Sequence, residues 1–213
     1  MDKNLTWVIS ERVKRTIDNL RRNNISAYNV QTCEQAIEKI MELVKDGSTV
    51  SVGGSMTLFD AGIIDHLRSG RYNFLDRYAE GLTPEDIKDI YRKSFSADAY
   101  FTSSNAITES GELFNVDGNG NRVAAMIYGP DKVIVIAGVN KIVKDEQQAM
   151  ERLRSTAAPA NARRLSRKTP CAELGYCTNC NRPDRICNDY VLIKKQPAND
   201  RMHVIIIDKE LGY

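Results

Sequence analysis

The stretch Thr49–Phe59, TVSVGGSMTLF, decides how the rest of the chain is arranged. A β-branched run meets two glycines and a serine just before an apolar helical pattern, which predicts a strand, a tight turn and a helix start. Glycines let a turn approach a ligand closely, and the first N–H groups of a helix point at an anion. Many α/β proteins use Gly-Gly-Ser here for geometry alone, so a ligand site and a plain turn are both open.

Helical and extended patterns alternate on both sides of this stretch. Strands that alternate with helices predict βαβ units, and therefore a mostly parallel sheet with helices on both faces. Ligands of such sheets bind beyond the carboxyl ends of the strands. The turn at Gly53 and the polar loop over 103–111 both follow strands, so we expect them at one edge. The expected helices cover 5–23, 32–44, 59–67, 83–96 and 144–154, and the expected strands 26–30, 49–52, 73–75, 98–102 and 133–139.

The second half of the chain carries further extended patterns. Residues 113–116 and 123–128 flank the Gly/Asn-rich stretch Asp117–Asn121, which predicts a hairpin. Two C-terminal strands are expected within 190–208, at 190–195 and 203–208.

The length of the chain indicates its domain count, and its charge argues against a polycation. A chain of 213 residues with 42% hydrophobic residues can bury a full core, so we expect a single domain over 1–213. The net charge of +2 is not that of a polycation, although the segment 151–187 holds eight basic residues against three acidic ones. Aromatic residues are sparse in that segment, which makes nucleic acid an unlikely partner.

The N-terminal residues lack the basic and apolar regions of a signal peptide. The longest apolar run, Val133–Val139, is too short to cross a bilayer. We therefore expect a cytoplasmic protein with no membrane partner.

Four of the five cysteines lie within the segment 169–189: Cys171, Cys177, Cys180 and Cys187. In a reducing compartment this clustering favours a metal over disulfides, although free thiols remain an alternative. The spacing Cys-x5-Cys-x2-Cys-x6-Cys supplies ligands for zinc or for an iron–sulfur cluster and does not decide between them. The basic flank suits a negatively charged metal site, or a docking face for an acidic redox partner.

Several motifs together resemble the lactate-utilization (LUD) domain family. The chain is most similar to the stand-alone branch that ends in a cysteine-rich segment. In order, the motifs are Gly53–Thr57, Ser104–Leu113, Asp117–Ala125, Gly129–Pro130 and Ala137–Val143, and the cysteine-rich segment is 169–189.

The resemblance implies a three-layer α/β/α fold related to the ribose-phosphate isomerase, glucosamine-phosphate deaminase and CoA-transferase superfamily. In those relatives the turn that matches Gly53-Gly54-Ser55 lines the pocket for a phosphorylated or CoA-linked substrate. Members of the LUD family are associated with the oxidation of lactate to pyruvate beside iron–sulfur proteins. The resemblance supplies neither a reaction for this branch nor its catalytic residues.

The candidate site combines the glycine turn with the polar loop and the end of the strand at 133–139. Glu109 is the acid best placed to act as a general base. An alternative is that the loop residues form a capped turn with no ligand. The expected ligand-binding residues are Gly53, Gly54, Ser55, Thr57, Asn105, Thr108 and Lys141.

Two functions follow from these residues. The first is a metabolic protein of the lactate-utilization type that binds a small anionic metabolite and carries a four-cysteine metal centre, used for electron transfer if it is iron–sulfur. The second is a non-catalytic subunit whose zinc-stapled basic C-terminal segment docks a redox or regulatory partner. The sequence is compatible with a homo-oligomer and fixes neither the oligomeric state nor the substrate.

Overall fold

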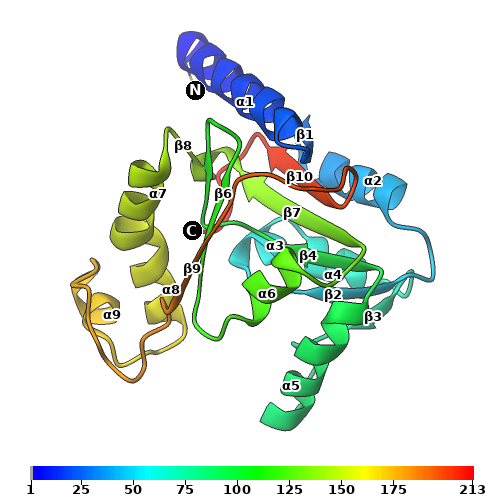
Figure 1. Cartoon of the computed structure of the whole chain (residues 1–213), viewed down its shortest axis with the longest axis vertical. Helices are drawn as coiled ribbons and strands as arrows, with labels where there is room; N and C mark the ends of the chain where they lie inside the picture. Colours follow the sequence, from blue (N-terminus) through cyan, green and yellow to red (C-terminus); the bar gives the residue numbers. More distant parts are fainter. Residues whose placement is uncertain (1) are drawn as a thin grey trace.

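A six-stranded parallel sheet forms the middle of the molecule in the computed structural model, which describes residues 2–213 (Figure 1). Every neighbouring pair is parallel, so the carboxyl ends of all six strands lie at one edge. In spatial order the strands are β1 (Ser26–Val30), β10 (Met202–Ile207), β7 (Lys132–Gly138), β4 (Ala99–Thr102), β2 (Thr49–Val52) and β3 (Asn73–Leu75).

Both faces of this sheet are covered, because successive side chains of each buried strand point to opposite sides. In β7, Val133 and Val135 join one apolar cluster, whereas Ile134 and Ile136 join the other. The first cluster lies under α1 (Lys3–Arg22) and α6 (Asn121–Ile127). The second lies under α2 (Cys33–Leu43), α3 (Met56–Asp60) and α4 (Ile63–Leu67). The expected three-layer α/β/α fold is confirmed.

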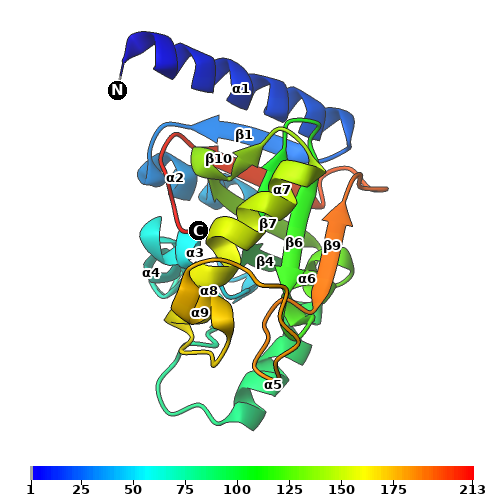
Figure 2. The same ribbon diagram turned by 90° about the vertical axis from the view of Figure 1, so that its left-hand side faces the viewer.

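A smaller sheet stands on the face that α1 covers, and Figure 2 shows its long strands upright beside α7. Its order is β8 (Ile142–Val143), β5 (Ala106–Thr108), β6 (Leu113–Asp117) and β9 (Asp189–Ile193). Alanines such as Ala149 and Ala157 pack on it from α7 (Glu146–Arg152) and from a π-helical stretch, η3 (Leu153–Ala157). The chain continues through α8 (Ala158–Arg164) and α9 (Pro170–Leu174) to the cysteines.

The remaining helix, α5 (Pro84–Lys93), buries none of its residues. It continues into the short 3-10 turn η1 (Ser94–Ser96). Its start is fixed by a capping box in which Thr83 Oγ1 accepts from Asp86 N and the Asp86 side chain accepts from Thr83 N. No helix in the described part of the chain has the length and apolar character needed to span a bilayer.

The hairpin expected around Asp117–Asn121 is wrong. Its second arm is helix α6, and β6 pairs with β5 and β9 instead. Gly120 adopts a left-handed conformation, with φ of 72°, and starts the helix. Ala125 and Met126 then lie three and four residues after Arg122, and all three face the interior.

Smaller differences concern element boundaries. The helix expected over 59–67 is two helices, α3 and α4, separated at Gly62, where φ is 69°. The polar loop over 103–111 contains strand β5. The strand expected at 190–195 exists as β9 but belongs to the smaller sheet. The strand expected at 203–208 is β10, next to β7 in the main sheet.

Candidate functional site

A cavity of about 450 Å³ lies at the carboxyl edge of the main sheet. The connections that leave five of the six strands each contribute lining: Gly54 after β2, Arg77 after β3, Ser103 after β4, Lys141 after β7 and Tyr213 after β10. The glycine turn and the start of the polar loop therefore share one edge, as expected. Sheets of this type place their ligand sites at this edge.

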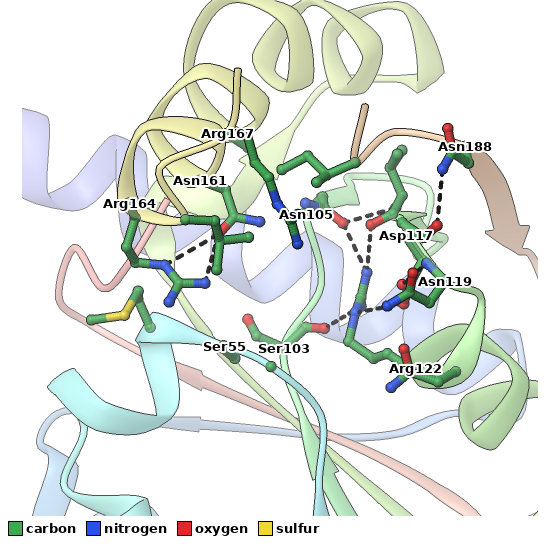
Figure 3. A pocket seen from close by; sticks show the side chains of 18 of the residues that line it. Ser55, Ser103, Asn105, Asp117, Asn119, Arg122, Asn161, Arg164, Arg167 and Asn188 are labelled. Atoms are coloured by element: carbon green, nitrogen blue, oxygen red, sulfur yellow. Dashed lines mark hydrogen bonds and ion pairs between the residues drawn. The ribbon is translucent and has the colours of Figure 1, made fainter. Parts of the chain in front are cut away.

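The cavity wall is strongly basic. Figure 3 shows Arg167 reaching into it from above, opposite Ser55 and Ser103, with Arg164 beside it on α8. Among the described residues, Arg122 is the only lining cation with an ion pair, to Asp117 at 3.4 Å. The lining cations are Arg77, Arg122, Lys141, Arg164, Arg167 and Arg185, and the lining acids are Asp117 and Asp184. Four arginines thus face the cavity with no carboxylate partner in residues 2–213, beside the buried Lys141.

Buried polar atoms without hydrogen bonds also gather here. Four such side-chain atoms occur in the described residues, and three belong to cavity residues: Arg77 Nε, Asp117 Oδ2 and Tyr213 Oη. The guanidinium group of Arg77 lies 4.7 Å from the ring centre of Tyr91 and 5.3 Å from that of Tyr78, so aromatic faces hold it in place. Unsatisfied buried groups are costly, and Asp117 Oδ2 has only its ion pair with Arg122 Nε at 3.4 Å to offset that cost.

Arg122 forms the floor of the cavity and is a structural group. Its guanidinium donates to Ser103 O, Asn115 Oδ1, Asn105 Oδ1 and Val116 O at distances between 2.7 and 3.2 Å. Burial lowers the pKa of Arg122, and Asp117 opposes this. Arg122 therefore ties the end of β4 to the smaller sheet.

Gly53 and Gly54 have different roles. A Cβ on Gly53 would lie 2.8 Å from Arg122 Cγ, so the glycine makes room for that side chain, and it does not line the cavity. A Cβ on Gly54 would lie 3.4 Å from Arg77 Nη1, and Gly54 does line the cavity. Ser55 lines it as well, whereas Thr57 is buried and donates to Leu211 O. Of the four expected residues in this turn, two reach the cavity.

Asn105 and Lys141 also line the cavity. The side-chain oxygen of Asn105 accepts from Val116 N at 2.8 Å and from Arg122 Nη2 at 3.2 Å, so much of its role is to hold β6. Lys141 belongs to the short helix η2 (Val139–Lys141) and is 2% exposed. Burial, with Arg152 and Arg122 nearby, lowers the pKa of Lys141 to about 7.

Thr108 and Glu109 lie outside the cavity lining, at the opposite end of the β5–β6 hairpin. Thr108 Oγ1 accepts from Glu112 N, which closes the turn. Glu109 pairs with Arg12 at 2.8 Å and Arg15 at 3.0 Å, and its main-chain oxygen accepts from the Asn19 amide. The turn is thereby fastened to α1. A general-base role for Glu109 stays a prediction that this placement does not support.

Three of the four clustered cysteines are neighbours. Burial raises the pKa of Cys187, Arg185 lowers it in part, and the thiols of Cys177 and Cys180 raise it further. Asn179 N donates to Cys177 Sγ at 3.3 Å, and Arg185 donates to the main-chain oxygens of Cys180 and Cys187.

Cys171 is not among the groups that shift the pKa of Cys187. It is buried against Ala162, Ala172 and Ile186. The four thiols match zinc or iron–sulfur in kind. As arranged in residues 2–213, however, no three His, Cys, Asp or Glu side chains form a group that could hold a metal ion.

The sequence interpretation missed several cavity residues. Arg77 follows β3. The argument that placed Gly54 at the carboxyl edge of the sheet, because it follows a strand, applies to Arg77 as well. Arg164 and Arg167 were noted as a basic flank of the cysteines, but no local pattern places α8 above the glycine turn. The residues missed include Arg77, Tyr91, Asn161, Arg164, Arg167, Arg185 and Tyr213.

Fold and site together define an α/β/α protein with a basic cavity at the carboxyl edge of a parallel sheet. The family model of the LUD domain matches residues 13–207, and the chain therefore belongs to the LUD domain family, as the motifs indicated. The family suggests a function related to lactate utilization. A comparison with curated proteins found no match.

Two solved structures resemble this one. A DUF162 family protein from Deinococcus radiodurans is 13% identical, with 93% of this chain and 98% of that chain covered and a TM-score of 0.55, which supports the fold. The eIF2B delta protein from Chaetomium thermophilum is 19% identical over 68% of this chain and 54% of that chain. Its TM-score is 0.35.

Proposed function

We propose that this protein is a lactate-utilization-type metabolic protein that binds a small anionic metabolite in the cavity beside Gly54. The metabolite class comprises hydroxy acids and phosphorylated or CoA-linked acids. The cavity volume of about 450 Å³ falls within the range of small-molecule sites.

One observation carries this proposal: four cavity arginines, Arg77, Arg164, Arg167 and Arg185, have no ion pair among the described residues. Charged side chains of folded proteins are usually solvated or paired, and a concave surface with one sign of charge concentrates ligands of the opposite sign. Guanidinium groups also match carboxylate and phosphate oxygens in shape. The cavity is therefore suited to an anion with one or two acidic groups.

The test is ligand-induced thermal stabilisation with L-lactate, pyruvate, a sugar phosphate and acetyl-CoA as probes. At least one probe should raise the melting temperature, because a ligand that binds only the folded state stabilises it by mass action. Gly54→Asp should abolish that rise, since the new carboxylate lies next to Arg77 and occupies the anion position. Ser69→Asp adds the same charge at an exposed position outside the cavity and should leave the rise intact.

Two results would contradict this proposal. If no probe shifts the wild-type protein, these anions are not its ligands. If Gly54→Asp responds as the wild type does, the ligand lies elsewhere on the molecule.

The cysteine segment forms the second part of the proposal. We propose that Cys171, Cys177, Cys180 and Cys187 hold zinc or an iron–sulfur cluster. The neighbourhood of three thiols and the N–H donor to Cys177 Sγ support it. A cluster would supply electron transfer to a redox partner. Zinc would favour the alternative function, a non-catalytic subunit that docks a redox or regulatory partner through its basic segment.

Metal content separates these outcomes. Iron, zinc and acid-labile sulfide should be measured on anaerobically purified protein, and one metal type should be stoichiometric. Cys177→Ser should lose it, whereas Cys33→Ser, which changes a thiol in α2, should retain it. Stoichiometric zinc without sulfide would end the electron-transfer interpretation. Absence of both metals would contradict the metal centre itself.

A further inference from the structure

One wall of the cavity is part of the cysteine-rich segment. This wall, residues 183–188, contains neither helix nor strand and leads directly into β9. Cys187 belongs to it but does not line the cavity, and its side chain packs against the apolar cluster of the smaller sheet. The residues of the wall that do line the cavity are Pro183, Asp184, Arg185, Ile186 and Asn188. The proposed anion site and the thiols therefore share one irregular piece of chain.

The wall is fastened to the turn that follows β6. Asn188 N donates to Asp117 O at 2.9 Å, and the Asn188 side-chain amide donates to Gly118 O at 2.9 Å (Figure 3). A Cβ on Gly118 would lie 3.3 Å from Ile186 Cα, so this glycine allows the two pieces of chain to approach closely. Asp117 and Gly118 line the cavity as well. The wall is thus held in place beside the cavity at its carboxyl end.

Arg185 connects the wall to the cysteines. Its Nε donates to Cys187 O at 2.9 Å, and its Nη1 donates to Cys180 O at 2.7 Å. Ile186, the next residue, packs against the small buried cluster that contains Cys171. The side chain that helps to form the cavity wall therefore also holds the main chain at two of the cysteines.

The guanidinium group of Arg185 can serve both sides. It lines the cavity and has no carboxylate partner in residues 2–213. The acid next to it, Asp184, accepts from Lys168 N at 3.0 Å. A bound anion would hold the guanidinium group between itself and the two cysteine carbonyl oxygens. Local opening around Cys180 and Cys187 would then also break the contact with the anion, so that opening becomes less favourable.

We propose that Arg185 couples the anion site to the thiols: a bound anion shields Cys177, Cys180 and Cys187 from thiol reagents, and blocking these thiols lowers anion affinity. This inference rests on the proposed anion site. The two effects must be equal in size, because coupling between two binding events is reciprocal. We expect about fivefold, the low end of the usual range, since Arg185 is one of several cavity cations.

Alkylation kinetics test this coupling on the wild-type protein as purified. The protein is treated with iodoacetamide in the absence and presence of L-lactate, pyruvate, a sugar phosphate or acetyl-CoA, and peptide mass mapping gives a rate for each cysteine. A probe that raises the melting temperature should slow alkylation of Cys177, Cys180 and Cys187 about fivefold. Cys33, which is half-buried in α2, should react at an unchanged rate, which separates coupling from general stabilisation of the fold.

Variants assign the effect to Arg185. Arg185→Met removes both hydrogen bonds to the cysteine carbonyl oxygens and should lose the protection at probe concentrations that saturate the variant. Arg182→Met changes an exposed arginine of the same segment that does not line this cavity, and it should keep the protection. In Cys33→Ser protein that has been fully alkylated, calorimetric titration should give an anion affinity lower by about the same factor of five.

Thermal shifts separate the possible failures. A thermal shift without slower alkylation, or slowing that affects Cys33 equally, would overturn the coupling and leave the anion site standing. Full protection in Arg185→Met, or an unchanged affinity after alkylation, would overturn it as well. Neither a shift nor slower alkylation with any of the four probes would remove the anion site and the coupling together. Because the kinetic comparison uses the wild-type chain, it holds however well the variants fold.

Discussion

Arginines gather at two places in this molecule, and they are used differently. At the turn that joins β5 to β6, Arg12 and Arg15 share the carboxylate of Glu109, and the three side chains fasten the turn to α1. At the other end of the same hairpin, the cavity arginines have no carboxylate partner within residues 2–213 except where Arg122 meets Asp117. In the first group every charge has an ion-pair partner within the folded chain. In the second group most charges have none among the described residues.

This difference separates charge that is paired within the chain from charge that is not. Glu109 was the acid expected to act on a substrate, yet it is satisfied by two arginines on α1. Arg122 is satisfied by main-chain and amide oxygens and supports the cavity floor. Arg77, Arg164 and Arg167 have no ion pair in residues 2–213, and we propose that they bind the anion. Four changes would test this division, and they are ordered here by their expected effect on stability.

Arg122→Met should be the most damaging. It removes a buried cation, takes away the ion-pair partner of Asp117 and leaves several carbonyl oxygens without a donor, which costs about 3–5 kcal/mol of unfolding free energy. Urea denaturation measures the loss. Arg15→Met, at an exposed arginine of the Glu109 group, should cost under about 1 kcal/mol. Equal losses of unfolding free energy in the two variants would contradict the buried structural role of Arg122.

Lys141 should make stability depend on alkaline pH. Its pKa is lowered from 10.5 to about 7 in the folded protein, so the unfolded chain binds more protons between these values and stability rises with pH across that window. The rise should be about 2 kcal/mol between roughly pH 7 and pH 9. Denaturation at several pH values checks this, and Lys141→Met should flatten the curve.

Glu109→Gln should cost about 1 kcal/mol or less at neutral pH, because its arginine partners are partly exposed. Burial raises the pKa of Glu109, but hydrogen bonds from Arg15 and Arg12 outweigh it and the net shift is downward. Its contribution is therefore present above the ordinary pKa of 4.5 and lost as pH falls through the lowered value. Anion-induced thermal shifts should be unchanged. Loss of the anion-induced thermal shift in this variant would indicate that Glu109 belongs to the anion site.

Arg167→Gln should barely change stability, by less than about 0.5 kcal/mol, because the side chain is exposed. Anion affinity should nevertheless fall about tenfold, since one charge-assisted contact is lost. Calorimetric titration measures the affinity. Arg154→Gln removes an exposed arginine that does not line the cavity and should leave the affinity unchanged.

Much of the fold was predictable because local patterns and global structure agree. Thr83-Pro84 and the capping box start α5 as expected, and the apolar run after Val133 is a central strand. The hairpin failed because Val123–Tyr128 is short and apolar, and such a run does not distinguish a strand from a buried helix. Burial of Arg122 and Met126 against other elements decided the outcome.

The site was predictable only where it depends on strand ends. Gly54, Ser55, Asn105 and Lys141 follow strands and reach the cavity. Thr108 and Glu109 share a loop-like sequence with Asn105, but β5 runs away from the edge and carries them with it. Arg164 and Arg167 come from a helix whose position depends on packing against the smaller sheet, which no local pattern encodes.

The pairing of β1 with β10 has a consequence for how the chain folds. Ser26 lies opposite His203, so the first strand of the sheet joins it only through the last one. During synthesis, α1 and β1 emerge well before β10, and β1 has no neighbouring strand to pair with until the residues of β10 have been made. Closing such a long loop late slows folding and leaves strand edges open to other chains. We expect the nascent protein to be a chaperone client over this interval.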